Sequence, residues 1–248
     1  MRKRIIEICA NSAQSCVEAE AGGATRVELC AGIPEGGTTP SYGEIYTART
    51  WAVNIAIHII IRPRGGDFIY SAIETDSMLY DIEMAHRLDI QGVVFGCLTP
   101  RGDLDTILMK KLVNAAKPLS ITFHRAFDIC RDPFTVLEQL IDLGCNRILT
   151  SGQEADAVQG IPLITELIRR ADNRIIIMPG CGINKDNIDL IERETGAVEF
   201  HASARSVHDS LMIHQNTRVM MESKMDLSDF KRVETSRIKV KDLVNAEN

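Results

Sequence analysis

Residues 121–128 read ITFHRAFD, an apolar run that breaks into ionisable side chains where a strand should end. Side chains alternate between the two faces of a strand, so Ile121 and Phe123 share one face and His124 lies on the other. We therefore predict a strand with one apolar face and one face that ends in chemically active groups. The ionisable residues at this end are His124, Arg125 and Asp128.

The same design recurs in seven other apolar runs, each followed by polar or glycine residues. Between the runs lie stretches with helical spacing, which begin at the capping residues Ser12, Asp103, Asp132 and Asn184. Strands that alternate with helices, without a linker or a shift in composition, predict one (β/α)8 barrel of the TIM type, a single domain over 1–248. The seven runs are 5–9, 26–30, 55–63, 92–96, 147–152, 174–180 and 198–203.

The sequence changes character after the eighth predicted strand. Residues 204–234 are polar, dotted with Met and without a clear period, so we predict a long loop there. Loops of this length in compact domains tend to be lids or binding loops. Only 235–246 has the pattern of a helix that closes the barrel.

The composition indicates a soluble globular protein and argues against several classes of partner. Hydrophobic residues make up 45% of the 248 residues and charged ones 25%, which suits a large buried core. The net charge is −6 and the pI is near 5.6, with scattered basic residues. Nucleic-acid and anionic-membrane binding rest on clustered Lys and Arg, so we expect neither. No run approaches transmembrane length.

The cysteines and the amino terminus indicate the cytoplasm. Seven cysteines cannot all pair, and none has the CxxC spacing typical of a zinc or redox site. Free thiols are typical of a reducing cytosol. The basic residues 1–4 precede an apolar run that is too short for a signal peptide, so we expect the protein to stay where it is made.

Polar side chains gather at the predicted carboxyl ends of strands one, two and eight, where barrel enzymes place their chemistry. Alternation turns the apolar residues toward the outer helices and the polar ones inward. In a closed barrel these three strands are neighbours, so their polar groups must be paired, protonated or bound to a ligand. The inward residues are Glu7, Cys9, Glu28, Cys30, Glu199, His201 and Ser203.

Three arginines at other strand ends are the expected partners of these carboxylates. Arg62 and Arg64 end strand three, and Arg125 ends strand five. An arginine fork holds a carboxylate or phosphate bidentately, and glycines let backbone amides approach an anion closely. We therefore predict that these loops bind a small anionic ligand. Further candidates for this role are Asp67, Ser151, Gly180, Gly182 and Ser203.

Structural explanations stay open for several of these residues. Glu7 and Glu28 either belong to a site or form buried ion pairs with arginines inside the barrel. His124 and Asp128 either belong to the site or cap the next helix, and the inward position of His124 favours the site. His58 lies deeper, so we interpret it as a core histidine. The glycines by themselves indicate only turns.

Cys9 and Cys30 also have two interpretations. Two inward sulfurs on adjacent strands suit a soft metal ion such as Cu(I), with His124 or His201 as a third ligand. Buried free cysteines are also ordinary small hydrophobic residues. The ligands would come from separate strands, without the spacing signature of a structural metal site.

Eight motifs occur in order along the chain: IEIC (6–9), RVELC (26–30), IRPRGGDF (61–68), GVVFG (92–96), TFHRAFD (122–128), ILTSG (148–152), PGCG (179–182) and EFHAS (199–203). Together they resemble the CutC family of copper-homeostasis proteins, from about residue 5 to at least residue 221. The resemblance implies a cytosolic (β/α)8 barrel that forms homo-oligomers and takes part in copper tolerance or binding. It also implies cysteine ligands for copper, at positions such as Cys9 and Cys30.

Two functions follow from these observations. The first is copper homeostasis, with copper bound at the carboxyl ends of the strands. The alternative is an enzyme of unidentified reaction that acts on a small phosphate or carboxylate substrate by acid–base or divalent-metal chemistry. The charged residues at the mouth favour the alternative, because a Cu(I) carrier needs sulfur ligands and none of these charges. The candidate catalytic residues are Glu7, Glu28, His124, Asp128, Glu199 and His201.

Overall fold

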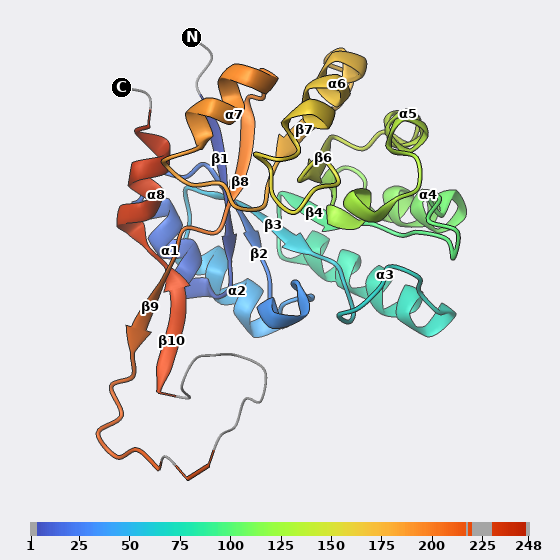
Figure 1. The fold of residues 1–248 in the computed structure, drawn as a ribbon. Coiled ribbons are helices and arrows are strands. Elements are labelled where there is room, and N and C mark those ends of the chain that lie inside the picture. Colours follow the sequence, from blue (N-terminus) through green and yellow to red (C-terminus); the bar gives the residue numbers. More distant parts are fainter. Residues whose placement is uncertain (1–3, 217, 220–229, 247–248) are drawn as a thin grey trace.

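The fold is described from a computed structural model, which covers residues 4–216, 218–219 and 230–246. Eight parallel strands form one sheet in the order β7-β6-β5-β4-β3-β2-β1-β8, and β7 and β8 also lie in contact. The sheet is therefore a nearly closed barrel (Figure 1), which confirms the predicted fold. The strands are β1 (Ile5–Ala10), β2 (Arg26–Leu29), β3 (Ala56–Ile60), β4 (Gly92–Phe95), β5 (Ser120–Phe123), β6 (Arg147–Thr150), β7 (Ile176–Pro179) and β8 (Glu199–Ala202).

The helices lie outside the barrel and cover the apolar faces of the strands (Figure 1). Strand alternation accounts for this packing: Ile6, Ile8 and Val27 belong to the buried apolar core, as predicted. The helices are α1 (Ala13–Ala21), α2 (Tyr42–Trp51), α3 (Ala72–Arg87), α4 (Thr106–Ala116), α5 (Pro133–Leu143), α6 (Ile161–Ala171), α7 (Ile188–Thr195) and α8 (Arg237–Val244), with short 3-10 helices η1 (Ile33–Glu35) and η2 (Arg125–Ile129).

Two of the four predicted helix caps are confirmed. The side chain of Ser12 accepts a hydrogen bond at the start of α1, and that of Asp132 accepts two at the start of α5. The prediction for α4 is wrong, because Asp105 caps that helix and the side chain of Asp103 pairs with Arg131.

The predicted start of α7 is also wrong. The side chain of Asn184 accepts from the backbone N–H of Asp186 and makes a turn, and the helix follows Asn187. Asn, Asp and Ser stabilise turns by the same side-chain hydrogen bonds that cap helices, so the sequence signal alone does not separate the two.

The segment after β8 contains an antiparallel hairpin, where we expected a loop throughout 204–234. Its strands are β9 (Arg205–Asp209) and β10 (Lys231–Thr235). β10 packs against α1, and the side-chain amide of Asn11 donates to the carbonyl of Val233 at 2.7 Å. The hairpin points away from the barrel (Figure 1). Residues 220–229 of the predicted loop lie outside the described residues.

The predicted closing helix is present and shorter than expected. α8 begins after Ser236, whose side chain caps it, and packs beside α1 and β1. No helix among the described residues has an apolar stretch long enough to cross a bilayer.

Candidate functional site

A cavity of about 510 Å³ opens at the carboxyl ends of the barrel strands. This volume falls within the range of small-molecule pockets, and the position is where barrel enzymes carry their sites. Nine of the residues singled out from the sequence line it: Cys9, Glu28, Cys30, Arg62, His124, Arg125, Gly182, His201 and Ser203.

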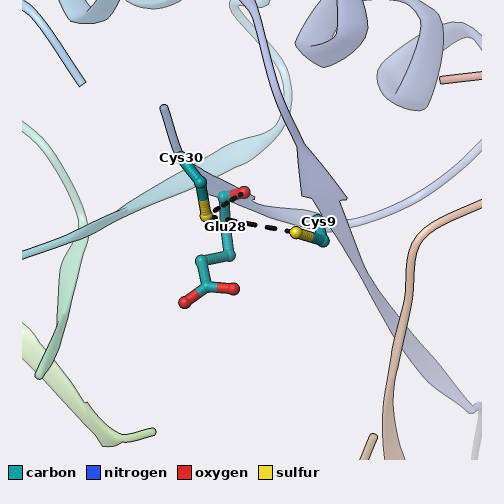
Figure 2. A group of neighbouring side chains, drawn as sticks. All are labelled: Cys9, Glu28 and Cys30. Atoms are coloured by element: carbon teal, nitrogen blue, oxygen red, sulfur yellow. Dashed lines mark hydrogen bonds between the residues drawn. The ribbon is translucent and has the colours of Figure 1, made fainter. Parts of the chain in front are cut away.

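The two thiols meet at the wall of this cavity. Cys9 pairs in register with Glu28 across β1 and β2, so Cys30 lies one pleat further along. The two Sγ atoms are 4.0 Å apart and face each other (Figure 2). A carboxylate oxygen of Glu28 and both sulfurs lie within 4.8 Å of one another, which makes the three residues a possible metal-binding group.

The two thiols differ in protonation. The hydrogen bond with Cys30 lowers the pKa of Cys9 well below its ordinary value, and His201 and Arg205 add to this effect against the cost of burial. A guanidinium nitrogen of Arg205 donates to Cys9 Sγ at 3.1 Å. The same contact with Cys9, together with burial, raises the pKa of Cys30 well above its ordinary value. Within the pair, Cys9 therefore gives up its proton more readily, and Cys30 holds its proton more tightly.

His201 connects the thiols to two carboxyl groups. Its Nδ1 lies 2.8 Å from Glu7 and its Nε2 lies 3.6 Å from Glu28. Burial opposes its protonation, yet hydrogen bonds to Cys9 and Glu7 raise the pKa of His201 well above its ordinary value. Burial raises the pKa of Glu28 to about 8, so this carboxyl is largely protonated at neutral pH.

Glu7 and Glu199 belong to a layer of buried ion pairs below the cavity. Arg26 bonds to both carboxylates, and Arg147 donates to Glu199 at 2.7 Å. Burial alone would raise the pKa of Glu7, but Arg26 and His201 outweigh burial and lower it. Neither Glu7 nor Glu199 lines the cavity. Glu7 therefore forms the buried ion pair that the structural interpretation expects, and Glu199 forms ion pairs in the same layer.

The expectation that Arg62, Arg64 and Arg125 pair with these carboxylates is wrong. Arg62 donates to three backbone carbonyls at 2.8–2.9 Å. Arg64 pairs with Asp67 and Glu74 outside the cavity. Arg125 pairs with Asp128 at 2.7 Å. The inward carboxylates pair instead with Arg26 at the start of β2 and Arg147 at the start of β6, because these arginines lie in the same interior layer.

His124 and Asp128 are separated by the chain turn of η2. His124 caps this turn: its Nδ1 accepts from the backbone N–H of Ala126 at 3.2 Å. Burial and the nearby Arg62 lower the pKa of His124 to about 3. Asp128 accepts from the backbone and side chain of Ser151 and fixes the loop after β6. Asp128 and Ser151 therefore support the wall and do not line the cavity.

The two predicted anion-binding glycines have different surroundings. Gly182 lines the cavity with a positive φ of 78°, a conformation that glycine adopts without strain. Gly180 packs so closely on Leu149 that an added Cβ would lie 2.5 Å from its side chain. Gly180 is therefore required for packing beneath the loop.

Among the lining residues that were not predicted as site residues, Arg205, Phe68 and Asn184 carry polar or aromatic groups into the cavity wall. Arg205 lies in β9, within a segment that carried no periodic signal. Phe68 follows the glycine loop and packs its ring 4.7 Å from that of His124. Asn184 was assigned to a helix start and instead lines the cavity. Only Arg205 had a usable signal, because it follows the polar end of β8 directly.

Comparison with known proteins identifies the family. The sequence matches the CutC family over residues 4–206. A CutC family protein of Parabacteroides distasonis is 68% identical over 239 residues, which cover 96% of this chain and 98% of the relative. The human protein named copper homeostasis protein cutC homolog is 45% identical, over 96% of this chain and 87% of its own length.

Solved structures agree with this assignment. CutC from Streptococcus agalactiae is 36% identical with a TM-score of 0.77, covering 80% of this chain and 97% of its own. Thiamine phosphate pyrophosphorylase from Pyrococcus furiosus, 16% identical with a TM-score of 0.55, covers 82% of this chain and 87% of its own, and shares the fold alone. By sequence and by fold, this chain belongs to the CutC family.

Proposed function

We propose that this protein binds Cu(I) between Cys9 and Cys30 and serves copper homeostasis. The observation that carries the proposal is the pair of sulfurs, 4.0 Å apart at the wall of an open cavity. Thiolate sulfur is a soft ligand that selects Cu(I), and the lowered pKa of Cys9 favours its thiolate form. The name of the human relative agrees with this role.

His201 is better placed than His124 to act as a third ligand. His201 forms a hydrogen bond with Cys9, whereas His124 uses its Nδ1 to cap η2. Because the pKa of His201 is raised, its ring must lose a proton before it can bind copper. A carboxyl oxygen of Glu28 lies within 4.8 Å of both sulfurs, but oxygen donors suit hard ions. Cys9 and Cys30 would therefore hold the ion, with His201 beside them.

An anaerobic titration against a Cu(I) chelator tests this proposal. The double variant Cys9→Ser/Cys30→Ser should weaken Cu(I) binding by more than about 100-fold, because both thiolates are lost. Cys181→Ser is the matched control, since Cys181 also lines the cavity and lies apart from the pair. An unchanged affinity in the double variant would refute copper binding at this pair.

A second candidate function is catalysis on a small anionic substrate by acid–base or divalent-metal chemistry. The observation that favours it is the group Glu7, Glu28 and His201, whose ligand atoms lie within 4.8 Å of one another. A carboxyl with its pKa raised to about 8 is poised to exchange a proton near neutral pH. Incubation with small phosphorylated and carboxylated metabolites should show turnover that Glu28→Gln removes from a folded protein. Turnover that survives this change would refute the assignment.

We also propose that the protein is cytoplasmic. All seven cysteines lie among the described residues and are free thiols, as expected in a reducing compartment. Cell fractionation tests this proposal.

We further propose that residues 1–248 form one domain and assemble into a homo-oligomer. A second copy would cover large exposed side chains on α2 and α3, namely Tyr42, Tyr46, Trp51 and Tyr80. Light scattering after gel filtration measures the assembly, and a monomer at micromolar concentration would refute it. A single cooperative unfolding transition is expected of one domain.

A further inference from the structure

The cavity has a second chemically distinct region, which begins beside β2 and extends around the barrel away from the thiols. β5, which leads into His124, is four strands away from β1, which carries Cys9. β3 leads into Arg62, and both Arg62 and His124 are only 4% exposed. Both side chains line the cavity. They form what we call the Arg62–His124 wall.

This wall contains N–H donors without acceptors. Nδ1 of His124 accepts from Ala126, so the hydrogen of the neutral ring is on Nε2, and Nε2 has no partner among the described residues. Nε of Arg62 also has none there. Leaving a buried donor unsatisfied destabilises the folded protein, so native proteins seldom keep two of them together without a reason.

The wall also carries charge without compensation. The guanidinium of Arg62 donates to three backbone carbonyls, interacts with the neutral hydroxyl of Tyr70 and pairs with no carboxylate in the described part of the chain. The other cations at the cavity are matched, since Arg125 pairs with Asp128 and Arg205 donates to the sulfur of Cys9, whose pKa is lowered. A buried guanidinium without a counter-charge is costly, and an anionic ligand removes that cost.

The side chains of this wall are held in place before any ligand arrives. The ring of Phe68 lies 5.0 Å from the Arg62 guanidinium carbon and 4.7 Å from the His124 ring. Three carbonyl contacts fix Arg62, and the cap of η2 fixes His124. Groups held this way bind without losing side-chain entropy.

We propose that Arg62 and His124 bind the oxyanion, carboxylate or phosphate, of a small organic molecule that occupies the cavity. A volume of about 510 Å³ exceeds what a single metal ion needs and suits such a molecule. Arg62 supplies the charge and His124 supplies a neutral Nε2–H donor. This site is independent of copper at Cys9 and Cys30, and it would hold the substrate of the second candidate function.

Calorimetric titration of the metal-free full-length protein tests the site. The probes are inorganic phosphate and succinate at matched ionic strength, which distinguish a phosphate from a carboxylate site. At least one probe should bind saturably at one site per chain. His124→Asn keeps an acceptor for the cap and removes the Nε2–H, so it should weaken binding at least about tenfold, as should Arg62→Met.

Two controls keep the result specific. Arg64→Gln removes a neighbouring arginine that does not line the cavity, and it should leave the affinity unchanged. Cys9→Ser/Cys30→Ser should also retain binding, which separates this site from the copper proposal. If Arg62→Met fails to fold, His124→Asn decides alone. Absence of saturable binding by both probes, or equal affinity in wild type and His124→Asn, would overturn the proposal.

Discussion

At the scale of single residues, the difference in protonation between Cys9 and Cys30 has a measurable consequence. Metal binding requires both sulfurs as thiolates, and the raised pKa of Cys30 means that this thiol must give up its proton to the solvent. Binding of Cu(I) should therefore release at least about one proton per ion. Calorimetry in buffers of different ionisation enthalpy counts the protons. Release of none would contradict the raised pKa of Cys30.

His124 gives a second prediction at this scale, on stability in acid. The pKa of His124 is about 3 in the folded protein, against an ordinary value of about 6.5. Protonation therefore favours the unfolded chain, and stability is lost as pH falls from about 6.5 toward 3, by up to about 1.4 kcal/mol per pH unit.

Urea unfolding of wild type and His124→Asn at several pH values measures this loss. Wild type should lose stability more steeply in acid than the variant. His58, whose pKa burial also lowers to about 3, contributes equally to both proteins and cancels in the comparison. If the free energy of unfolding fell with pH equally in wild type and His124→Asn, the surroundings of His124 would not hold its ring neutral.

At the scale of elements, the hairpin of β9 and β10 matters because β9 begins at Arg205, which donates to Cys9. Arg205→Met should raise the pKa of Cys9, since a positive charge that favours the thiolate is removed. The rate at which Cys9 is alkylated can be measured as a function of pH in a Cys181→Ser background. The midpoint of this pH profile should shift to higher pH in Arg205→Met. Lys239→Met, which removes a nearby cation that donates to the Arg205 carbonyl, is the control. An unshifted profile would mean that Cys30 and His201 alone set this pKa.

Sequence reasoning predicted the barrel strands and missed this hairpin for a physical reason. The eight barrel strands bury one apolar face, so their residues carry a period that can be counted. Residues 205–209 and 231–235 are mostly polar, and backbone hydrogen bonds pair them. These strands have no apolar face, so the sequence contains no alternating pattern that would predict them. Arg205 was missed with them.

The same comparison explains the errors inside the barrel. Parity along β1, β2 and β8 placed Glu7, Cys9 and Glu28 inward, and the structure brings them together. Arg26 shares the parity of Glu28 and Cys30, so alternation also predicts that it points inward. Arg26 is therefore one of the arginines inside the barrel that the structural interpretation of Glu7 and Glu28 requires, whereas the expectation for Arg62 rested on its place at a strand end.

At the scale of the whole molecule, the layer of buried ion pairs ties distant strands together. Glu199 of β8 bonds to Arg26 of β2 and Arg147 of β6. Glu199→Gln should destabilise the protein by about 3–5 kcal/mol, because two buried guanidinium groups lose their shared counter-charge. Denaturant unfolding measures the change.

An exposed ion pair provides the matched control. Glu138 bonds to Arg174 at 2.7 Å on the surface, and Glu138→Gln should destabilise the protein far less than Glu199→Gln, because solvent screens the exposed pair. Equal costs for the two variants would mean that the buried layer contributes no more to stability than a surface pair does.

X-ray absorption at the copper edge shows which atoms bind copper, and so whether copper binds to the two facing sulfurs. Wild-type protein loaded anaerobically with Cu(I) should show two sulfur ligands, and Cys9→Ser/Cys30→Ser should show none. A copper environment of nitrogen and oxygen alone in wild type, or a sulfur signal that persists in the double variant, would contradict copper binding at these sulfurs.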